Sequence, residues 1–244
     1  MTRNADADWD RWPVTTYLAE NYRVVHPSDA AVIAAHSAYY RRIPAGSLDR
    51  TVELGAGPNL YPLMLASAAS RHIDAVETSA ANVAYLRAQV TGGADPSWAA
   101  FHDECRRHNP DLPDLPTALS RVRVRHADLT SAVGAGYDLA SMHFVAESVT
   151  TDPAEFRALC GAFAAAVRPG GHLVAAFMNG MPTYSLGDGS TWPGLPVDAD
   201  TVAEVFAPLT RECVVTVVPR DETLPAYGDD GMIVLHGRTR AHRT

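Results

Sequence analysis

The residues from Thr51 to Leu60 are the ones whose types and spacing most directly suggest chemistry. They read Thr-Val-Glu-Leu-Gly-Ala-Gly-Pro-Asn-Leu, so a short apolar run ends in Gly55-x-Gly57 and a helical pattern follows. Glu77 ends the next apolar run, twenty residues after Gly57. A glycine turn lets a ligand lie against the backbone, and an acid at the tip of the second strand can hold two ribose hydroxyls. The spacing predicts a nucleoside-containing cofactor; the alternative is a strand–turn–helix whose glycines serve geometry only.

The glycine pattern differs from that of a dinucleotide site. Leu60 stands where G-x-G-x-x-G requires its third glycine, which allows close approach to a pyrophosphate. Glu53, two residues before the first glycine, is an acid that can hydrogen-bond an ammonium group. S-adenosyl-L-methionine (SAM) carries an ammonium group and no phosphate. We therefore predict SAM rather than NAD as the cofactor, bound by Glu53, Gly55, Gly57 and Glu77.

Composition excludes several classes of function. The formal net charge of −8 argues against a surface that binds nucleic-acid phosphates. The chain contains no lysine, so a pyridoxal-phosphate Schiff base and a P-loop are both impossible. No apolar run approaches the roughly 20 residues of a membrane span, and the N-terminal residues lack an apolar signal core. We expect a cytoplasmic protein that acts on a small molecule, with no nucleic-acid or membrane partner.

Strand-like and helical patterns alternate along most of the chain. Strands are predicted at 50–54, 73–76, 122–126, 139–143, 172–178, 213–219 and 232–237, and helices at 60–69, 80–90, 153–167 and 200–207. This alternation predicts an α/β fold with a Rossmann-like, mostly parallel sheet of seven strands. The last two strands are joined by a loop too short for a crossover helix, so they should form a C-terminal antiparallel hairpin.

Two further segments complete the predicted single domain, 1–244. Residues 9–45 hold several Trp and Tyr residues among helical-looking stretches, and we predict a helical cap over the cofactor end of the Rossmann-like core at 46–244. Residues 91–120 are rich in Pro and Asp and are interpreted as an insertion before the third strand. His102, Cys105 and His108 lie within it at close spacing, but they match no standard zinc pattern, so we expect solvated residues and no metal site.

Polar residues follow the third and fourth predicted strands as well. Asp128 comes after the third strand, where a side-chain acceptor can receive an adenine amino group, and His143 ends the fourth. Open α/β sheets bind ligands beyond the carboxyl ends of their strands. We therefore expect Asp128 and His143 to share one crevice with Gly55 and Glu77. The other interpretation of Asp128 is a turn acid or helix cap.

Several motifs together resemble a known family. They are Tyr17-Leu-Ala-Glu-Asn-Tyr22, Val52-Glu-Leu-Gly-Ala-Gly-Pro-Asn-Leu-Tyr61, Glu77-Thr-Ser-Ala-Ala-Asn82, Ala127-Asp-Leu-Thr130, Arg168-Pro-Gly-Gly171 and Pro182-Thr-Tyr184-Ser-Leu-Gly187. The chain resembles class I SAM-dependent methyltransferases and, more narrowly, the family of nicotinamide, phenylethanolamine and thioether methyltransferases. The motifs run from about residue 15 to about residue 200.

The resemblance implies roles for individual residues. It implies that Tyr17 and Tyr22 close over SAM and that Tyr61 contacts the methionine carboxylate. The remaining implied cofactor contacts are Glu77 and Asn82 at the ribose and adenine, Asp128 and Leu129 at the adenine, and His143 at the methionine part. It also implies that the acceptor ring lies between Phe144 and Tyr184.

The chain departs from the family at the acceptor site. Amine-methylating members place a carboxylate after the fifth strand, where Phe177 aligns in this chain and Asn179 follows two residues later. Glu147 remains as a candidate acid, either in the pocket or as a cap of the following segment. Phe144, Glu147, Asn179 and Tyr184 are therefore the candidate catalytic residues, and the acceptor atom (N, O or S) stays open.

The sequence leaves three functions to compare. The favoured one is a SAM-dependent methyltransferase acting on a small molecule, in which alignment and exclusion of water matter more than a strong base. A SAM-dependent cyclase would close a small ring within SAM and release methylthioadenosine. A SAM-binding protein without catalysis would act through protein contacts.

Overall fold

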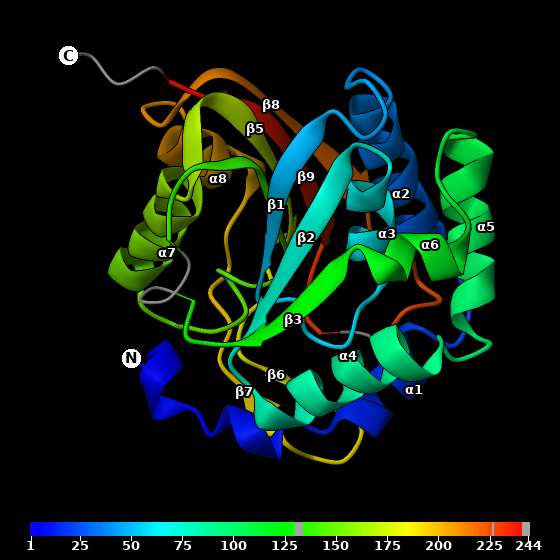
Figure 1. Ribbon diagram of the computed structural model, residues 1–244. Coiled ribbons are helices and arrows are strands. Elements are labelled where there is room, and N and C mark those ends of the chain that lie inside the picture. Colours follow the sequence, from blue (N-terminus) through cyan, green and yellow to red (C-terminus); the bar gives the residue numbers. More distant parts are fainter. Residues whose placement is uncertain (130–133, 226, 241–244) are drawn as a thin grey trace.

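The computed structural model describes residues 1–129, 134–225 and 227–240 and contains a seven-stranded sheet in the order β3-β2-β1-β4-β5-β9-β8 (Figure 1). Its strands are β1 (Leu48–Leu54), β2 (Ser70–Glu77), β3 (Val122–His126), β4 (Tyr137–His143), β5 (Val167–Met178), β8 (Thr210–Pro219) and β9 (Gly231–Thr239). The α-helices are α1 (Val14–Asn21), α2 (Pro27–Tyr40), α3 (Tyr61–Ser67), α4 (Ala80–Gly92), α5 (Trp98–His108), α6 (Leu115–Ser120), α7 (Pro153–Ala165) and α8 (Ala199–Phe206).

The pairing of the strands confirms the predicted fold class. The first five sheet strands pair in parallel, whereas β9 is antiparallel to both β5 and β8. The chain direction reverses at β9 because the loop after β8 holds no helix that could carry it back across the sheet. All seven predicted strands form, with ends shifted by a few residues.

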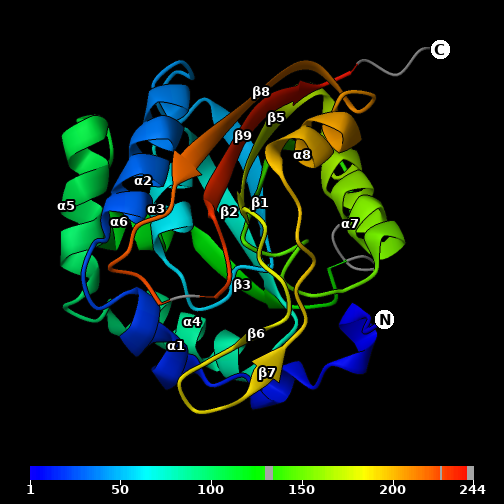
Figure 2. The same ribbon diagram turned by 180° about the vertical axis from the view of Figure 1, so that it is seen from behind.

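Strand alternation divides the core into two apolar clusters, one on each face of the sheet. On β5, Leu173, Ala175 and Phe177 pack toward α7 and α8, whereas Val174 and Ala176 pack toward α2 and α3. Figure 2 shows α7 and α8 together on one side of the sheet, with α2, α3, α5 and α6 on the other. Each face is therefore covered, as a parallel sheet requires.

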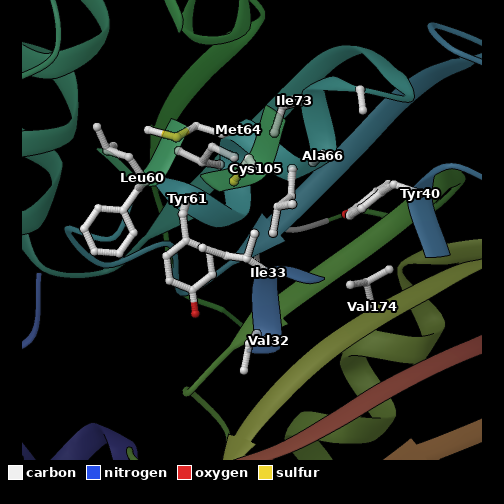
Figure 3. Close-up of a cluster of buried hydrophobic side chains, with 14 of the residues drawn as sticks. Val32, Ile33, Tyr40, Leu60, Tyr61, Met64, Ala66, Ile73, Cys105 and Val174 are labelled. Atoms are coloured by element: carbon white, nitrogen blue, oxygen red, sulfur yellow. The ribbon is translucent and has the colours of Figure 1, made fainter. Parts of the chain in front are cut away.

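The predicted helical cap over 9–45 divides into two parts. α2 lies on the face of the sheet, and its side chains Val32, Ile33 and Tyr40 are buried in the core beside Tyr61 and Val174 (Figure 3). Only the residues before α2 cover the carboxyl ends of the strands. Val32, Ile33 and Tyr40 recur at helical spacing, and apolar side chains on one side of a helix are buried against the sheet.

The expectation that His102, Cys105 and His108 of the 91–120 insertion are solvated is wrong for the first two, which are buried. The insertion contains α5 and α6, and Trp98, Phe101 and Cys105 of α5 are fully buried in the core. His102 is also buried, and its Nε2 lies 2.9 Å from the Pro113 carbonyl oxygen. Within the described residues no group of His, Cys, Asp and Glu is placed to hold a metal ion. Aromatic residues spaced along one side of α5 were the sequence signal for burial.

The N-terminal residues and a small hairpin lie across the carboxyl ends of the sheet strands (Figure 1). This region holds two short 3₁₀ helices, Asn4–Asp6 and Trp9–Arg11, followed by α1. The hairpin pairs β6 (Tyr184–Ser185) with β7 (Thr191–Trp192) and was not predicted. A search of the described helices for one long and apolar enough to cross a membrane finds none.

Candidate functional site

A large cavity opens at the carboxyl edge of the sheet, under the N-terminal segment. It encloses about 1160 Å³ of empty space, counting the part open to solvent. Its walls come from the glycine loop after β1, the tips of β2, β4 and β5, and the N-terminal and C-terminal loops. Ten of the predicted site residues line it: Tyr17, Tyr22, Gly55, Gly57, Glu77, Asn82, Leu129, His143, Phe144 and Tyr184.

The glycine loop has a backbone geometry that favours glycine. Gly55 and Gly57 have φ angles of 65° and 55°, in the left-handed region. A Cβ on Gly55 would lie 2.7 Å from both methyl carbons of Val145, so a side chain there would clash as well as strain the backbone. The backbone of the loop therefore forms part of the cavity wall directly.

Glu77 connects the tip of β2 to this loop. One carboxylate oxygen accepts the backbone N–H of Gly57 at 2.8 Å, and the other accepts that of Ser79 at 2.7 Å. Burial raises the pKa of Glu77, and these two hydrogen bonds act in the opposite direction. The acid is thus held at the cavity wall with lone pairs still available for hydroxyl donors.

The structure describes only part of the region where the sequence predicted the adenine contacts. Asn82 lies in the first turn of α4, lines the cavity, and its buried side-chain oxygen has no hydrogen-bond partner. Leu129 also lines the cavity, whereas Asp128 is exposed and is not part of the wall. Thr130, the last residue of that motif, lies outside the described residues.

Glu53 lies behind the cavity rather than on its wall. Its carboxylate accepts a hydrogen bond from the Ser141 hydroxyl and lies 2.9 Å from Nδ1 of His143. Ser141 pairs with Glu53 on the neighbouring strand, and His143 lies two residues after Ser141. All three side chains therefore point to the α2 face of the sheet. The carboxylate of Glu53 therefore lies against His143, and it is His143 that reaches the cavity.

Two more histidines, His36 and His236, extend this group of buried polar side chains beneath α2. Nδ1 of His36 lies 2.8 Å from Nε2 of His236, and the His36 ring packs edge-on against that of His143 with centroids 4.9 Å apart. Burial lowers the pKa of His236 to about 4 and that of His36 well below its usual value. Both rings are therefore neutral at pH 7, and one donates a hydrogen bond to the other.

The three predicted tyrosines differ in how they reach the cavity. Tyr22 accepts a hydrogen bond from the Asn59 side chain at 3.0 Å, and its hydroxyl lies 3.4 Å from that of Tyr17. Tyr17 and Tyr22 both line the cavity. Tyr61 is fully buried behind it, stacked on Phe101 with ring centroids 6.0 Å apart, and its hydroxyl has no hydrogen-bond partner.

Aromatic rings gather at the end of the cavity under the N-terminal segment. The rings in mutual contact come from segments far apart in the chain: Trp9, Trp12, Tyr17, Tyr184, Trp192 and Tyr227. Trp9 stacks on Trp192 at 5.1 Å between centroids, and Trp12 packs edge-on against Trp192 at 4.8 Å. This arrangement suits a flat or cationic ligand, because ring faces attract both.

Phe144 and Tyr184 both line the cavity. Phe144 follows β4 with φ of 58°, a conformation that costs a bulky residue about 1–3 kcal/mol. Its backbone N–H donates to the Ala176 carbonyl at 2.7 Å, which holds the strained residue at the tip of the sheet. Tyr184 is placed by the small hairpin, where it pairs with Trp192.

Phe177 is not a pocket residue. It is fully buried on the opposite face of the sheet, where its ring contacts those of Phe156 on α7 and Phe206 on α8. Strand alternation instead turns Met178 to the cavity. Asn179 is also absent from the wall; its backbone bonds to Gly231, which ties β5 to the start of β9.

Glu147 has neither of the two roles left open by the sequence. Its carboxylate accepts the backbone N–H of Met178 at 2.9 Å and the Ser148 hydroxyl at 3.2 Å, and it does not line the cavity. Burial raises the pKa of Glu147 to about 7. The side chain connects the loop after β4 to the tip of β5 and so supports both Phe144 and Met178 from behind.

Sequence reasoning missed several residues of the wall. Trp9 and Trp12 were assigned to the cap but not to the site, and Tyr227 was treated as part of a loop. Asp29 and Asp229 add two carboxylates, whereas no arginine belongs to the wall formed by the described residues. The density of aromatic residues before Pro13 was the available signal; nothing local marks Asp29 or Tyr227.

Comparison with known proteins finds no matching family model and no matching curated protein. Solved structures do match. One is DhpI in complex with SAH, with a TM-score of 0.57 and 19% identity, covering 95% of this chain and 94% of that one. Another is the N-methyltransferase NodS from Bradyrhizobium japonicum with S-adenosyl-L-homocysteine (SAH), with a TM-score of 0.54 and 14% identity over 95% of this chain and 99% of that one.

A third match is the 1,6-didemethyltoxoflavin-N1-methyltransferase of Burkholderia thailandensis, with its acceptor and SAH bound. Its TM-score is 0.52 at 18% identity, over 87% of this chain and 80% of that one. At these identities the matches establish a shared fold. The chain has the Rossmann-like fold of methyltransferase structures that have been solved with SAM or SAH.

Proposed function

We propose that this chain is a SAM-dependent methyltransferase that acts on a small molecule. The observation that carries the proposal is the convergence of Gly55, Gly57 and Glu77 on one cavity wall that holds carboxylates and no arginine among the described residues. A dinucleotide would bring a pyrophosphate to this place, and nothing described there neutralises it. SAM brings a ribose for Glu77 and positive charge for the acids.

Different residues of the cavity wall are assigned to the cofactor and to the acceptor. Glu77 and Asn82 are positioned for the ribose hydroxyls, and Leu129 is positioned for the adenine. Tyr17 and Tyr22 cover the methionine part. This division matches what the narrower resemblance to nicotinamide and phenylethanolamine methyltransferases implies, and it extends that family's tyrosine pair to a larger group of rings.

Methyl transfer follows from alignment in this setting. SAM supplies a methyl group already activated on a sulfonium. Phe144 and Tyr184 hold a flat acceptor in line with that methyl, and the surrounding tryptophans exclude water. Ring faces stabilise the cationic charge near the reacting atoms. The acceptor atom can be nitrogen, oxygen or sulfur.

Calorimetry and product analysis test the proposal. We expect the protein to bind SAM and SAH, to show no measurable binding of NADH, and to produce SAH when a suitable acceptor is present. Methylthioadenosine formed from SAM alone would instead indicate the cyclase. SAM binding without turnover across a broad acceptor panel would favour a non-catalytic role. Saturable NADH binding would overturn the cofactor assignment.

A matched pair of glycine variants separates the site from the fold. Gly55→Ala and Gly46→Ala both force a side chain onto a positive φ, 65° and 61°, so they carry similar backbone strain. Only Gly55 meets the Val145 side chain and lines the cavity; Gly46 faces open space. We expect Gly55→Ala to abolish SAM binding and Gly46→Ala to retain it. Equal SAM affinity in both variants would place the cofactor elsewhere.

A further inference from the structure

Asp29 is a buried carboxylate on the cavity wall that has no charged partner. It lies in the first turn of α2, is only 2% exposed, and lines the cavity beside Tyr17, Tyr22 and the glycine loop. None of the ion pairs found among the described residues includes it. The Tyr61 hydroxyl is close enough to lower the pKa of Asp29, but it makes no hydrogen bond of normal geometry.

Three other buried acids of this region, Glu53, Glu77 and Glu147, already have donors; Glu147 accepts the backbone N–H of Met178. Glu77 accepts two backbone N–H groups, and Glu53 is taken up by Ser141 and His143. A buried carboxylate without such donors is costly, because burial removes the water that would otherwise solvate its charge. The N-terminus of α2 offsets part of that cost, since a helix start favours negative charge. The remaining cost is removed if a ligand brings a cation to Asp29.

Resting on the proposed SAM site, we propose that the carboxylate of Asp29 binds the α-ammonium group of SAM. The sequence assigned an ammonium contact to Glu53, but that carboxylate lies behind the cavity wall, against Ser141 and His143. Asp29 faces the same cavity from α2, next to the tyrosines that cover the methionine part. The site thus recognises the amino-acid end of SAM by a helix-borne acid rather than by a strand residue.

The proposal implies that SAM binding is linked to a proton. Burial raises the pKa of Asp29 to about 7 in the free protein. A bound ammonium group favours the ionised carboxylate and lowers that pKa, so SAM affinity should fall progressively as the pH drops below about 7. An α-amino group titrates near pH 7.7–8.0 and so stays charged throughout that lower range.

The groups around Asp29 determine how this linkage is measured. Tyr17 and Tyr61 face it from α1 and α3, Tyr22 from the end of α1, and Asp221 from the loop after β8. Burial keeps the pKa of all three tyrosines above the range of interest. The pKa of Asp221 is lowered, so it stays ionised there. Glu77 also lines the cavity with a raised pKa, and the proposed function assigns it to the ribose rather than to the amino acid.

Two ligands separate Asp29 from Glu77. Methylthioadenosine keeps the adenine, ribose and sulfur of SAM but lacks the ammonium and carboxylate. We expect Asp29→Asn to weaken SAM binding by about 10- to 100-fold, the scale for losing a hydrogen bond to a charged group, and to change methylthioadenosine binding by less than about threefold. In the wild-type protein, SAM affinity should fall by up to about tenfold per pH unit from pH 7 to pH 5.5, while methylthioadenosine affinity stays nearly level.

Each other outcome is informative. Equal losses for both ligands would make Asp29 a structural residue and overturn the inference. Normal SAM affinity in Asp29→Asn with impaired turnover would place Asp29 at the acceptor and also overturn it. If the variant does not fold, the pH dependence of the wild-type protein decides, and equal slopes for the two ligands would contradict the inference. Failure of the wild-type protein to bind either ligand would overturn the proposed function itself.

Discussion

The glycine-loop end of the cavity is held by hydrogen bonds between neighbouring strand tips, whereas its aromatic end is held by ring packing between segments far apart in the chain. At the first end, Glu77 bonds the backbone of Gly57 and Ser79 across the tips of β1 and β2. At the second, Trp9 from the N-terminal segment stacks on Trp192 from the small hairpin. The first depends on backbone geometry, and the second depends on apolar surface.

The two ends therefore differ in how far their residues can change without loss of the fold. Backbone donors at strand tips are placed by the sheet itself, so the glycine-loop end is rigid before any ligand arrives. Trp9 lies on a three-residue 3₁₀ helix, and Tyr184 and Trp192 lie on a hairpin with two-residue strands, which few backbone hydrogen bonds support. We therefore infer that the glycine-loop end binds the cofactor and that the aromatic end adapts to the acceptor.

The largest expected effect lies outside both ends, at Phe177. Phe177→Asp places a charge in the apolar cluster under α7 and α8, which should lower the free energy of unfolding by about 3–5 kcal/mol or prevent folding. Thermal or urea denaturation measures this change. Phe177→Leu keeps the cluster apolar and should fold. A stable Phe177→Asp protein that methylates amines faster would mean that Phe177 faces the aromatic end after all.

Tyr184→Ala should separate the two ends in a single variant. It removes one wall of the aromatic end and leaves the glycine loop intact, so turnover should fall on the order of 100-fold, while SAM affinity changes little. Tyr184→Phe keeps the ring and should retain most activity. Steady-state kinetics and calorimetry give the two quantities. Normal turnover in Tyr184→Ala would place the acceptor away from this ring.

Glu77→Ala tests the glycine-loop end in the same way. SAM affinity should fall by roughly 1–3 kcal/mol, because ribose hydroxyls lose a charged acceptor and the Gly57 N–H loses its partner. Asp138→Ala is the matched control. Asp138 also accepts two backbone N–H groups, from Asp49 and Arg50, but at the opposite end of the sheet.

Each variant loses two hydrogen bonds to the backbone, and Asp138→Ala also loses the ion pair with Arg168, but only Glu77→Ala should lose SAM affinity. Differential scanning calorimetry and binding calorimetry measure stability and SAM affinity on the same samples. Unchanged SAM affinity in folded Glu77→Ala would remove Glu77 from the site.

The smallest effects are expected at the two tyrosine hydroxyls. Tyr22→Phe leaves the Asn59 side chain without its acceptor and should cost about 0.5–1.5 kcal/mol in both apo stability and SAM binding. Tyr17→Phe removes a longer hydroxyl contact of 3.4 Å and should change apo stability less. Melting temperatures with and without SAM compare the two. A larger stability loss from Tyr17→Phe than from Tyr22→Phe would reverse the roles assigned here.

The sequence predicted more of the glycine-loop end of the cavity than of the aromatic end. Gly55, Gly57 and Glu77 were found because each lies at the end of a strand, and parallel strands bring their carboxyl ends to one edge. Glu53 and Phe177 were misassigned because both depend on which face of a strand a side chain occupies. Alternation sets that face relative to its neighbours, but only packing decides which face meets α2 and which meets α7 and α8.

The sequence alone determined the fold class and the mostly parallel pairing of the strands. It also determined the terminal hairpin and the glycine loop with Glu77. These features depend on periodicity and on local turn chemistry, which act within about 20 residues of the chain. Tertiary structure alone decided that α2 joins the core, that Trp9 meets Trp192, and that Asp29 faces the cavity without a charged partner among the described residues. Those contacts join residues separated by long stretches of chain, and burial against a distant surface leaves no local pattern in the residues that take part.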